Sequence, residues 1–134
     1  MAPHLLDTNI ASHIIKGTTP AVDRRLAKVP VANIFISTVT EAELRYGLAK
    51  LKKAPRLEAL VEDFLLMVTI LPWDSEAAKH YGLLRSKLEH RGVPMANLDL
   101  MIGAHAVALG ATLVTSDRAF SRIENLKTAD WTRG

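Results

Sequence analysis

The sequence contains no cysteine, few aromatic residues and no apolar run long enough to cross a membrane. Without cysteine the chain has no disulfide framework, no thiolate zinc site and no cysteine nucleophile. The longest apolar stretch, residues 64–71, includes Thr69 and falls well short of the roughly 20 residues that span a bilayer. The chain does not open with a basic segment followed by an apolar one, so no signal peptide is expected. These absences predict a soluble, cytoplasmic protein that does not bind membranes.

The chain does have enough apolar material for one core. Hydrophobic residues make up 49% of the 134 residues, which argues against disorder, and this length suits a single domain over residues 1–134. The 17 Lys and Arg residues outnumber the 14 Asp and Glu residues, so the net charge is +3. This mildly basic balance is compatible with nucleic-acid binding but does not demand it.

Strand and helix signals alternate along the chain. Short runs of apolar and β-branched residues predict strands at 4–6, 33–37, 68–71, 112–115 and 127–129. Helical spacing, with Gly and Pro at the boundaries, predicts helices at 8–16, 20–26, 40–51, 57–64, 75–92 and 97–109, and a helical turn at 117–122. This alternation favours the α/β class, with a central mostly parallel sheet covered by helices on both faces.

Three acidic residues follow predicted strands. Asp7 comes directly after the first strand, Glu43 lies just beyond the second, and Asp117 follows the fourth. Ligands of open α/β sheets bind outside the carboxyl ends of the strands, so these residues fall at the expected functional edge. A fourth acid, Asp99, lies at the start of an otherwise apolar helix. Each can also be an ordinary helix cap or first-turn residue, so their joint placement carries the inference.

Glu43 competes with Glu41 for a place in this group. Two residues that are two positions apart on a helix differ in direction by about 200°, so both cannot face one site. Glu43 shares its face with Tyr46 and Gly47, and a glycine there would let a neighbouring element approach closely. It also completes a capping-box pattern with Thr40, which is its structural alternative. We favour Glu43 for the site.

Carboxylates that meet at one edge repel one another unless a cation neutralises them. Oxygen ligands, without cysteine and without paired histidines, favour Mg²⁺ or Mn²⁺ over Zn²⁺. The common use of such a site is phosphodiester hydrolysis, in which the metal activates a water molecule and stabilises charge on the phosphoryl oxygens. We expect Asp7, Asp99 and Asp117 to be the main ligands, with Glu43 nearby or bound through water.

Four segments also carry a family resemblance. They are LLDTNI (5–10), ISTVTEAELRYG (36–47), NLDLMIGAHA (97–106) and TLVTSDRAF (112–120). In this order they resemble the PIN domain and, more narrowly, the VapC toxins of bacterial toxin–antitoxin pairs. The resemblance implies an α/β/α sandwich and Mg²⁺-dependent endoribonuclease activity on structured RNA, chiefly tRNA. It also implies a homodimer and inhibition by a cognate VapB antitoxin.

The resemblance places the acidic quartet of the family on Asp7, Glu43, Asp99 and Asp117. Polar neighbours match as well: Thr8 and Asn9 follow the first acid, and Thr115 or Ser116 supplies the hydroxyl beside the last.

Positive charge is expected outside the acidic pocket, where it can hold the RNA backbone. The candidates for this role are Arg85, Arg91, Arg118 and Arg122. Because an arginine fork pairs well with carboxylates, we expect an antitoxin to insert Arg or Lys near Asp7 and Asp99.

Apolar residues of the helices at 40–51 and 57–64 exceed what one small core needs. The surplus is expected to form a homodimer face or to receive an antitoxin helix. The residues concerned are Leu44, Leu48, Leu57, Leu60, Phe64 and Leu65.

Other functions fit the sequence less well. A DNA-directed nuclease is the nearest alternative, because it would share the metal chemistry. A phosphatase of the haloacid dehalogenase type wants a second Asp two residues after the first, where this chain has Asn9. A non-catalytic RNA- or protein-binding module would be expected if the acidic set were incomplete.

Overall fold

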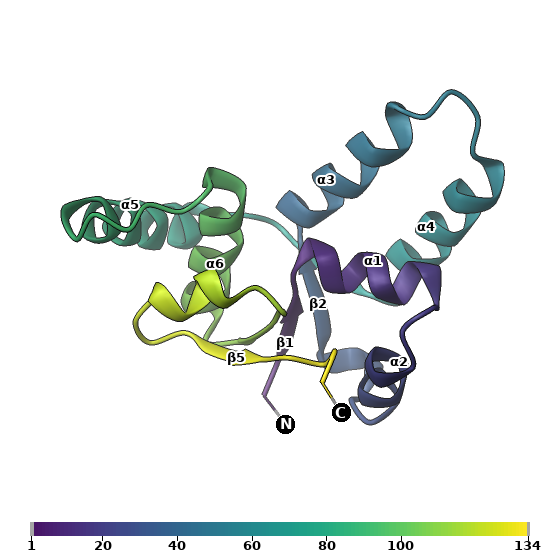
Figure 1. Cartoon of the computed structure of the whole chain (residues 1–134), viewed down its shortest axis with the longest axis horizontal. Coiled ribbons are helices and arrows are strands. Elements are labelled where there is room, and N and C mark those ends of the chain that lie inside the picture. Colours follow the sequence, from purple (N-terminus) through teal and green to yellow (C-terminus); the bar gives the residue numbers. More distant parts are fainter. Residues whose placement is uncertain (1, 134) are drawn as a thin grey trace.

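A central parallel sheet organises the chain in the computed structural model, which describes residues 2–133 (Figure 1). The strands are β1 (His4–Leu6), β2 (Ile34–Ser37), β3 (Thr69–Leu71), β4 (Thr112–Val114) and β5 (Lys127–Ala129). They lie in the order β3-β2-β1-β4-β5, and every neighbouring pair is parallel. The predicted α/β class is confirmed, and the mostly parallel sheet is parallel throughout.

Six α-helices and two short 3₁₀ helices connect these strands. They are α1 (Thr8–Lys16), α2 (Pro20–Ala27), η1 (Val31–Asn33), α3 (Thr38–Ala49), α4 (Pro55–Met67), α5 (Ser75–His90), α6 (Asn97–Leu109) and η2 (Arg118–Arg122). Within residues 2–133 no helix is both long and apolar enough to span a bilayer.

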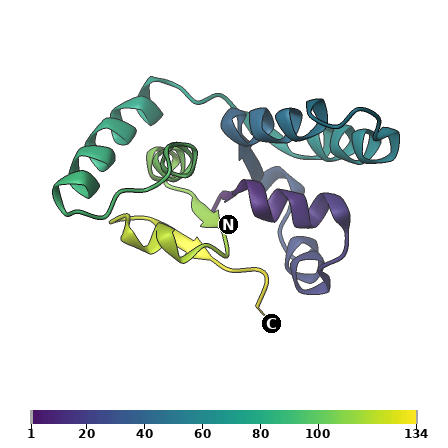
Figure 2. The same ribbon diagram turned by 45° about the horizontal axis from the view of Figure 1, so that its top comes forward.

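Each face of the sheet carries its own apolar core. Because side chains alternate along a strand, Leu5 and Leu113 pack in the core under α5 and α6, whereas Leu6 and Val114 pack in the core under α1 to α4. Figures 1 and 2 show these two groups of helices on opposite sides of the strands. Residues buried on both faces explain why the strands read as apolar runs. The α/β/α sandwich implied by the resemblance is therefore confirmed.

The predicted start of the third helix was wrong. α3 begins at Thr38, because the Ser37 hydroxyl accepts a hydrogen bond from the Val39 amide at 3.1 Å and caps the helix directly after β2. Thr40 is therefore inside the first turn and fully buried, and it forms no capping box with Glu43. The other boundaries shift by up to three residues; for example, α4 ends at Met67, three residues beyond the predicted end.

Half of the residues from which a homodimer face or an antitoxin groove was expected are buried. Leu44, Phe64 and Leu65 are buried in the chain's own core, where α3 and α4 cover one face of the sheet together. Leu48 and Leu57 pack against the same core. Of the six residues proposed for this face, Leu60 alone is exposed. The apolar surplus was overestimated because both helices of the hairpin contribute to one core.

Candidate active site

Asp7 lies where β1 gives way to α1, at the carboxyl edge of the sheet. Its carboxylate caps α1 by accepting a hydrogen bond from the Ile10 amide at 2.8 Å, and its side chain is buried. Burial raises the pKa of this carboxyl above its ordinary value. Hydrogen bonds from the Thr115 hydroxyl and the Ile10 amide lower the pKa, whereas the charges of Asp99 and Asp117 raise it further. Asp7 is thus both a helix cap and a member of a charged cluster.

Asp99 and Asp117 approach the same place from the other side of β1. Asp99 lies in the first turn of α6, and its pKa is raised first by burial and then by the charges of Asp117 and Glu43. Asp117 follows β4 and caps η2 through a 2.9 Å hydrogen bond from the Ala119 amide. The charges of Asp99 and Asp117 thus act on Asp7, and those of Asp117 and Glu43 act on Asp99, which links the four predicted acids into one electrostatic group.

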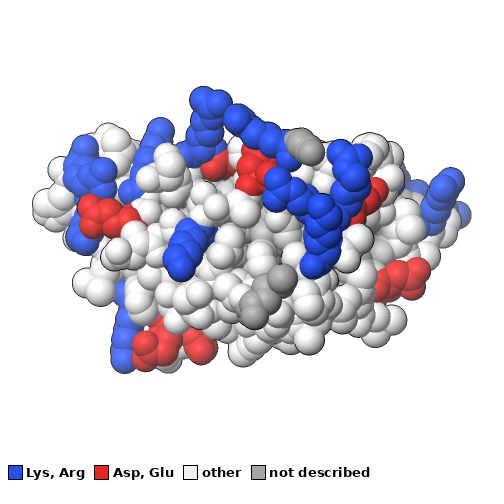
Figure 3. Space-filling view, turned by 90° about the horizontal axis from the view of Figure 1, so that it is seen from below, with Lys and Arg blue, Asp and Glu red and all other residues white. Residues whose placement is uncertain are grey.

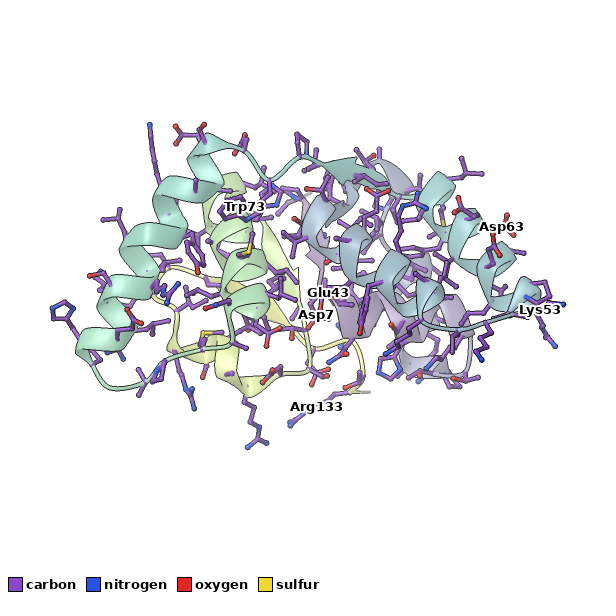
Figure 4. All side chains as sticks on the ribbon, turned by 90° about the horizontal axis from the view of Figure 1, so that it is seen from above. Asp7, Glu43, Lys53, Asp63, Trp73 and Arg133 are labelled. Atoms are coloured by element: carbon purple, nitrogen blue, oxygen red, sulfur yellow. The ribbon has the colours of Figure 1, made fainter. Side chains whose placement is uncertain are left out.

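Glu43 reaches the group from α3, and Figure 4 shows it next to Asp7 at the centre of the molecule. The Thr8 hydroxyl donates a 2.5 Å hydrogen bond to Glu43 Oε1 and lies 3.3 Å from the Thr40 hydroxyl. The sequence did not indicate that the Thr40 hydroxyl lies beside Thr8 at this site. The burial of a hydroxyl in the first turn of a helix depends on tertiary packing, which the sequence pattern does not contain.

Two other acids form ion pairs with nearby arginines and are not counted in the cluster. Glu41 pairs with Arg45 at 3.0 Å, so the choice of Glu43 over Glu41 agrees with the geometry. Asp130 follows β5 and was not considered from the sequence. Its pKa is lowered, first by the Thr132 hydroxyl, and Arg133 lies 3.4 Å away. The negative charge of these two residues is compensated, whereas that of Asp7 and Asp99 is not.

The four carboxylates have the donor chemistry of a hard divalent cation. Only oxygen ligands are present, and the raised pKa values of Asp7 and Asp99 indicate negative charge that a cation would offset. In the part of the chain that is described, no three His, Asp or Glu side chains converge closely enough to enclose an ion as they stand. One oxygen each of Asp7, Glu43 and Asp117 is engaged in a hydrogen bond.

The polar neighbours predicted from the sequence divide into two groups. Thr8 and Thr115 touch the acids: Thr8 holds Glu43, and Thr115 donates to Asp7 and accepts from the Asp117 amide at 3.0 Å. Asn9 and Ser116 are exposed. Ser116 lines a hollow together with Asp117 and Arg118.

The predicted arginines differ in how they are held. Arg118 is exposed beside Asp117, and Arg122 donates to the Pro94 carbonyl at 3.5 Å. Arg85 and Arg91 pair with Glu89 and Glu124, at 3.5 and 3.9 Å. Figure 3 shows that Lys and Arg also gather on the opposite face, at the amino ends of the strands. Positive charge is therefore not confined to the rim of the acidic cluster.

Comparison with known proteins agrees with this geometry. The PIN-domain family profile matches residues 4–126. The chain is 37% identical over 132 residues to the tRNA(fMet)-specific endonuclease VapC of Shigella flexneri, covering 98% of this chain and 99% of that one. It is 36% identical over 130 residues to ribonuclease VapC2 of Rickettsia felis, covering 96% and 97%. The DNA-bound VapBC structure from Salmonella typhimurium superposes with a TM-score of 0.90 at 34% identity, over 98% of this chain and 99% of that one.

Proposed function

The chain belongs to the PIN-domain family and within it to the VapC ribonucleases, and from that premise we propose that Asp7, Glu43, Asp99 and Asp117 form its nuclease site. The observation that carries this assignment is the placement of the four carboxylates at one edge of the sheet, where the charges of the other acids help to raise the pKa of Asp7 and of Asp99. In a chain with a net charge of +3, such a concentration of negative charge favours a bound cation.

PIN-domain nucleases are in general dependent on a divalent metal, and we propose Mg²⁺ or Mn²⁺ here because the donors are all oxygen. Asp7, Asp99 and Asp117 would hold the ion, with Glu43 beside it. The bound ion would supply an activated water molecule and stabilise charge on the phosphoryl oxygens. Thr8 orients Glu43 through its hydroxyl, and Thr115 supports both Asp7 and the Asp117 amide.

The proposed substrate is a structured RNA, with tRNA as the first candidate, so the protein would act in the cytoplasm. The support is the name of the Shigella flexneri relative, a tRNA(fMet)-specific endonuclease. Arg118 and Arg122 flank the last acid and are the best-placed contacts for phosphates. Arg85 and Arg91 would first have to exchange their surface ion pairs for phosphate contacts, so we expect them to contribute less.

A matched pair of substrates tests this function. We expect a tRNA in Mg²⁺ buffer to be cut at one or a few positions, and a DNA strand of the same sequence to remain intact. Denaturing gel electrophoresis of both digestions gives the comparison. Equal cleavage of DNA would favour the DNA-directed alternative, and binding of tRNA without cleavage would favour a non-catalytic module.

We also propose a VapB-like antitoxin as partner, and a homodimer as the assembly of the toxin. The support for the antitoxin is that similar solved structures are VapBC complexes, including the one from Salmonella typhimurium. The uncompensated carboxylates of Asp7 and Asp99 would attract an inserted Arg or Lys.

If the inserted cation and the metal share a site, raising Mg²⁺ should weaken inhibition by the antitoxin. Cleavage rates at fixed antitoxin and increasing Mg²⁺ measure this competition. Inhibition that stays constant over a hundredfold range of Mg²⁺ would mean that the partner covers the RNA path without entering the acidic cluster.

A further inference from the structure

An apolar groove of about 700 Å³ opens directly beside the acidic cluster, between α3 and the first turns of α6. We call it the α3–α6 groove. It is lined by Thr8, Thr38, Val39, Ala42, Glu43, Tyr46, Gly47, Lys50, Trp73, Leu98 and Met101. Glu43 and Thr8 thus belong both to the groove and to the site, so a ligand in the groove would lie against one of the four carboxylates. The sequence had suggested that Gly47 lets a neighbouring element approach closely. A Cβ added there would meet open space, so no element makes such an approach.

One wall of the groove is a fixed aromatic ring. The Trp73 indole Nε1 donates to the Met101 carbonyl at 2.9 Å, and the Trp73 amide donates to the Thr38 hydroxyl at 3.1 Å. The Tyr81 ring meets the indole edge-on with a centroid separation of 5.9 Å. Figure 4 places Trp73 on the α6 side of the centre occupied by Asp7 and Glu43. This wall is held in place before any ligand arrives.

Tyr46 forms the other aromatic side of the groove and is 68% exposed. The chain has seven aromatic residues, all within the described range, and the other six are buried or half-buried. Tyr46 lies one helical turn after Glu43, about 4.5 Å farther along the axis. Lys50 Nζ lies over the tyrosine ring, 5.3 Å from its centroid, at the end of the groove away from Glu43. The groove therefore presents an exposed ring, with a lysine beside it, next to the acidic site.

We propose that the α3–α6 groove binds one unpaired base of the RNA, next to the scissile phosphate, with the base stacked on Tyr46. This inference rests on the proposed nuclease function. The groove suits a ligand with a flat apolar part, whereas the neighbouring site suits an anionic group bridged by a cation, and a nucleotide has both. Lys50 is then placed to meet the next phosphate of the strand. Aromatic side chains beside positive charge are the common means by which proteins hold single strands.

The test uses a short single-stranded oligoribonucleotide in which 2-aminopurine replaces each base in turn. Stacking on an aromatic ring quenches the fluorescence of this base analogue. Binding is measured with Asp7→Asn protein, so that the strand is not cut, and the cleavage position is mapped separately with the unmodified chain. Tyr46→Ala removes the stacking ring, and Ala42→Met fills the groove from an exposed position of α3. Ala59→Met makes the same change at an exposed position of α4 outside the groove and serves as the control.

We expect strong quenching at one position, the nucleotide that adjoins the cleaved bond. Tyr46→Ala and Ala42→Met should remove this quenching and weaken binding about tenfold, whereas Ala59→Met should change neither. Quenching that survives both groove variants would overturn the proposal. A second result would also overturn it. If light scattering showed that Ala42→Met converts a dimer to a monomer while RNA binding is unchanged, a second copy of the chain would fill the groove.

The outcomes separate this proposal from the nuclease function. If quenching depends on Tyr46 but the unmodified chain cuts no RNA, the base site is supported and the nuclease function is refuted. Cleavage without any quenching that depends on Tyr46 would support the nuclease and refute the base site.

Discussion

Replacing Asp7 with Asn should lower the rate of RNA cleavage by about 10³-fold without unfolding the protein. Loss of a metal ligand removes several kcal/mol of transition-state stabilisation, and each factor of ten in rate corresponds to about 1.4 kcal/mol. Asn caps helices as well as Asp does, so the hydrogen bond from the Ile10 amide can be kept. Single-turnover cleavage rates and the thermal unfolding midpoint measure the two parts of this prediction.

The unfolding midpoint of Asp7→Asn in metal-free buffer should equal or exceed that of the unmodified chain. The pKa of Asp7 is raised in the folded protein, first by burial, so its ionised form is destabilising at neutral pH. A neutral Asn removes this penalty.

Asp63→Asn is the matched control, because Asp63 is exposed on α4 and Figure 4 shows it far from Asp7. The control should keep full activity. Full activity in Asp7→Asn would remove Asp7 from the site.

The place of two acids at the functional edge could be anticipated from the sequence, because buried parallel strands read as apolar runs. Asp7 and Asp117 stand directly after such runs, so the pattern put both at the carboxyl ends of strands. The pairing of β1 with β4, which makes these two strand ends neighbours, is seen only in the structure. Helix geometry indicated that Glu41 and Glu43 cannot both face one site, and in the structure Glu41 pairs with Arg45. What these arguments share is that they depend on local periodicity.

Features that depend on contacts between distant segments were missed. The capping-box pattern indicated Thr40 as the cap of α3, whereas the structure ends β2 at Ser37 and caps the helix with that residue. Leu44, Phe64 and Leu65 looked like a surplus because the sequence does not show that α3 and α4 share one core. The α3–α6 groove was likewise invisible, since Trp73 and Met101 come together across 28 residues.

Removal of divalent metal should abolish cleavage, with a loss of at least 10²-fold in excess EDTA. Without a cation, the carboxylates of Asp7 and Asp99 would repel the scissile phosphate, and no other group at the site can activate water as strongly. Added Mg²⁺ or Mn²⁺ should restore the rate, and both ions should raise the unfolding midpoint of the unmodified chain. In Asp7→Asn that rise in midpoint should be reduced or lost, whereas Asp63→Asn should retain it.

The most direct test of the central claim is the position of Mn²⁺ in crystals of the unmodified chain, located by its anomalous scattering. We expect a peak in contact with carboxylate oxygens of Asp7, Asp99 and Asp117, with Glu43 in contact directly or through water. The same crystals of Asp7→Asn should show a weaker peak or none. The contradicting result would come from protein that still cleaves RNA. If saturating Mn²⁺ gave such protein a peak elsewhere, or no peak at these carboxylates, the assignment of the site would be wrong.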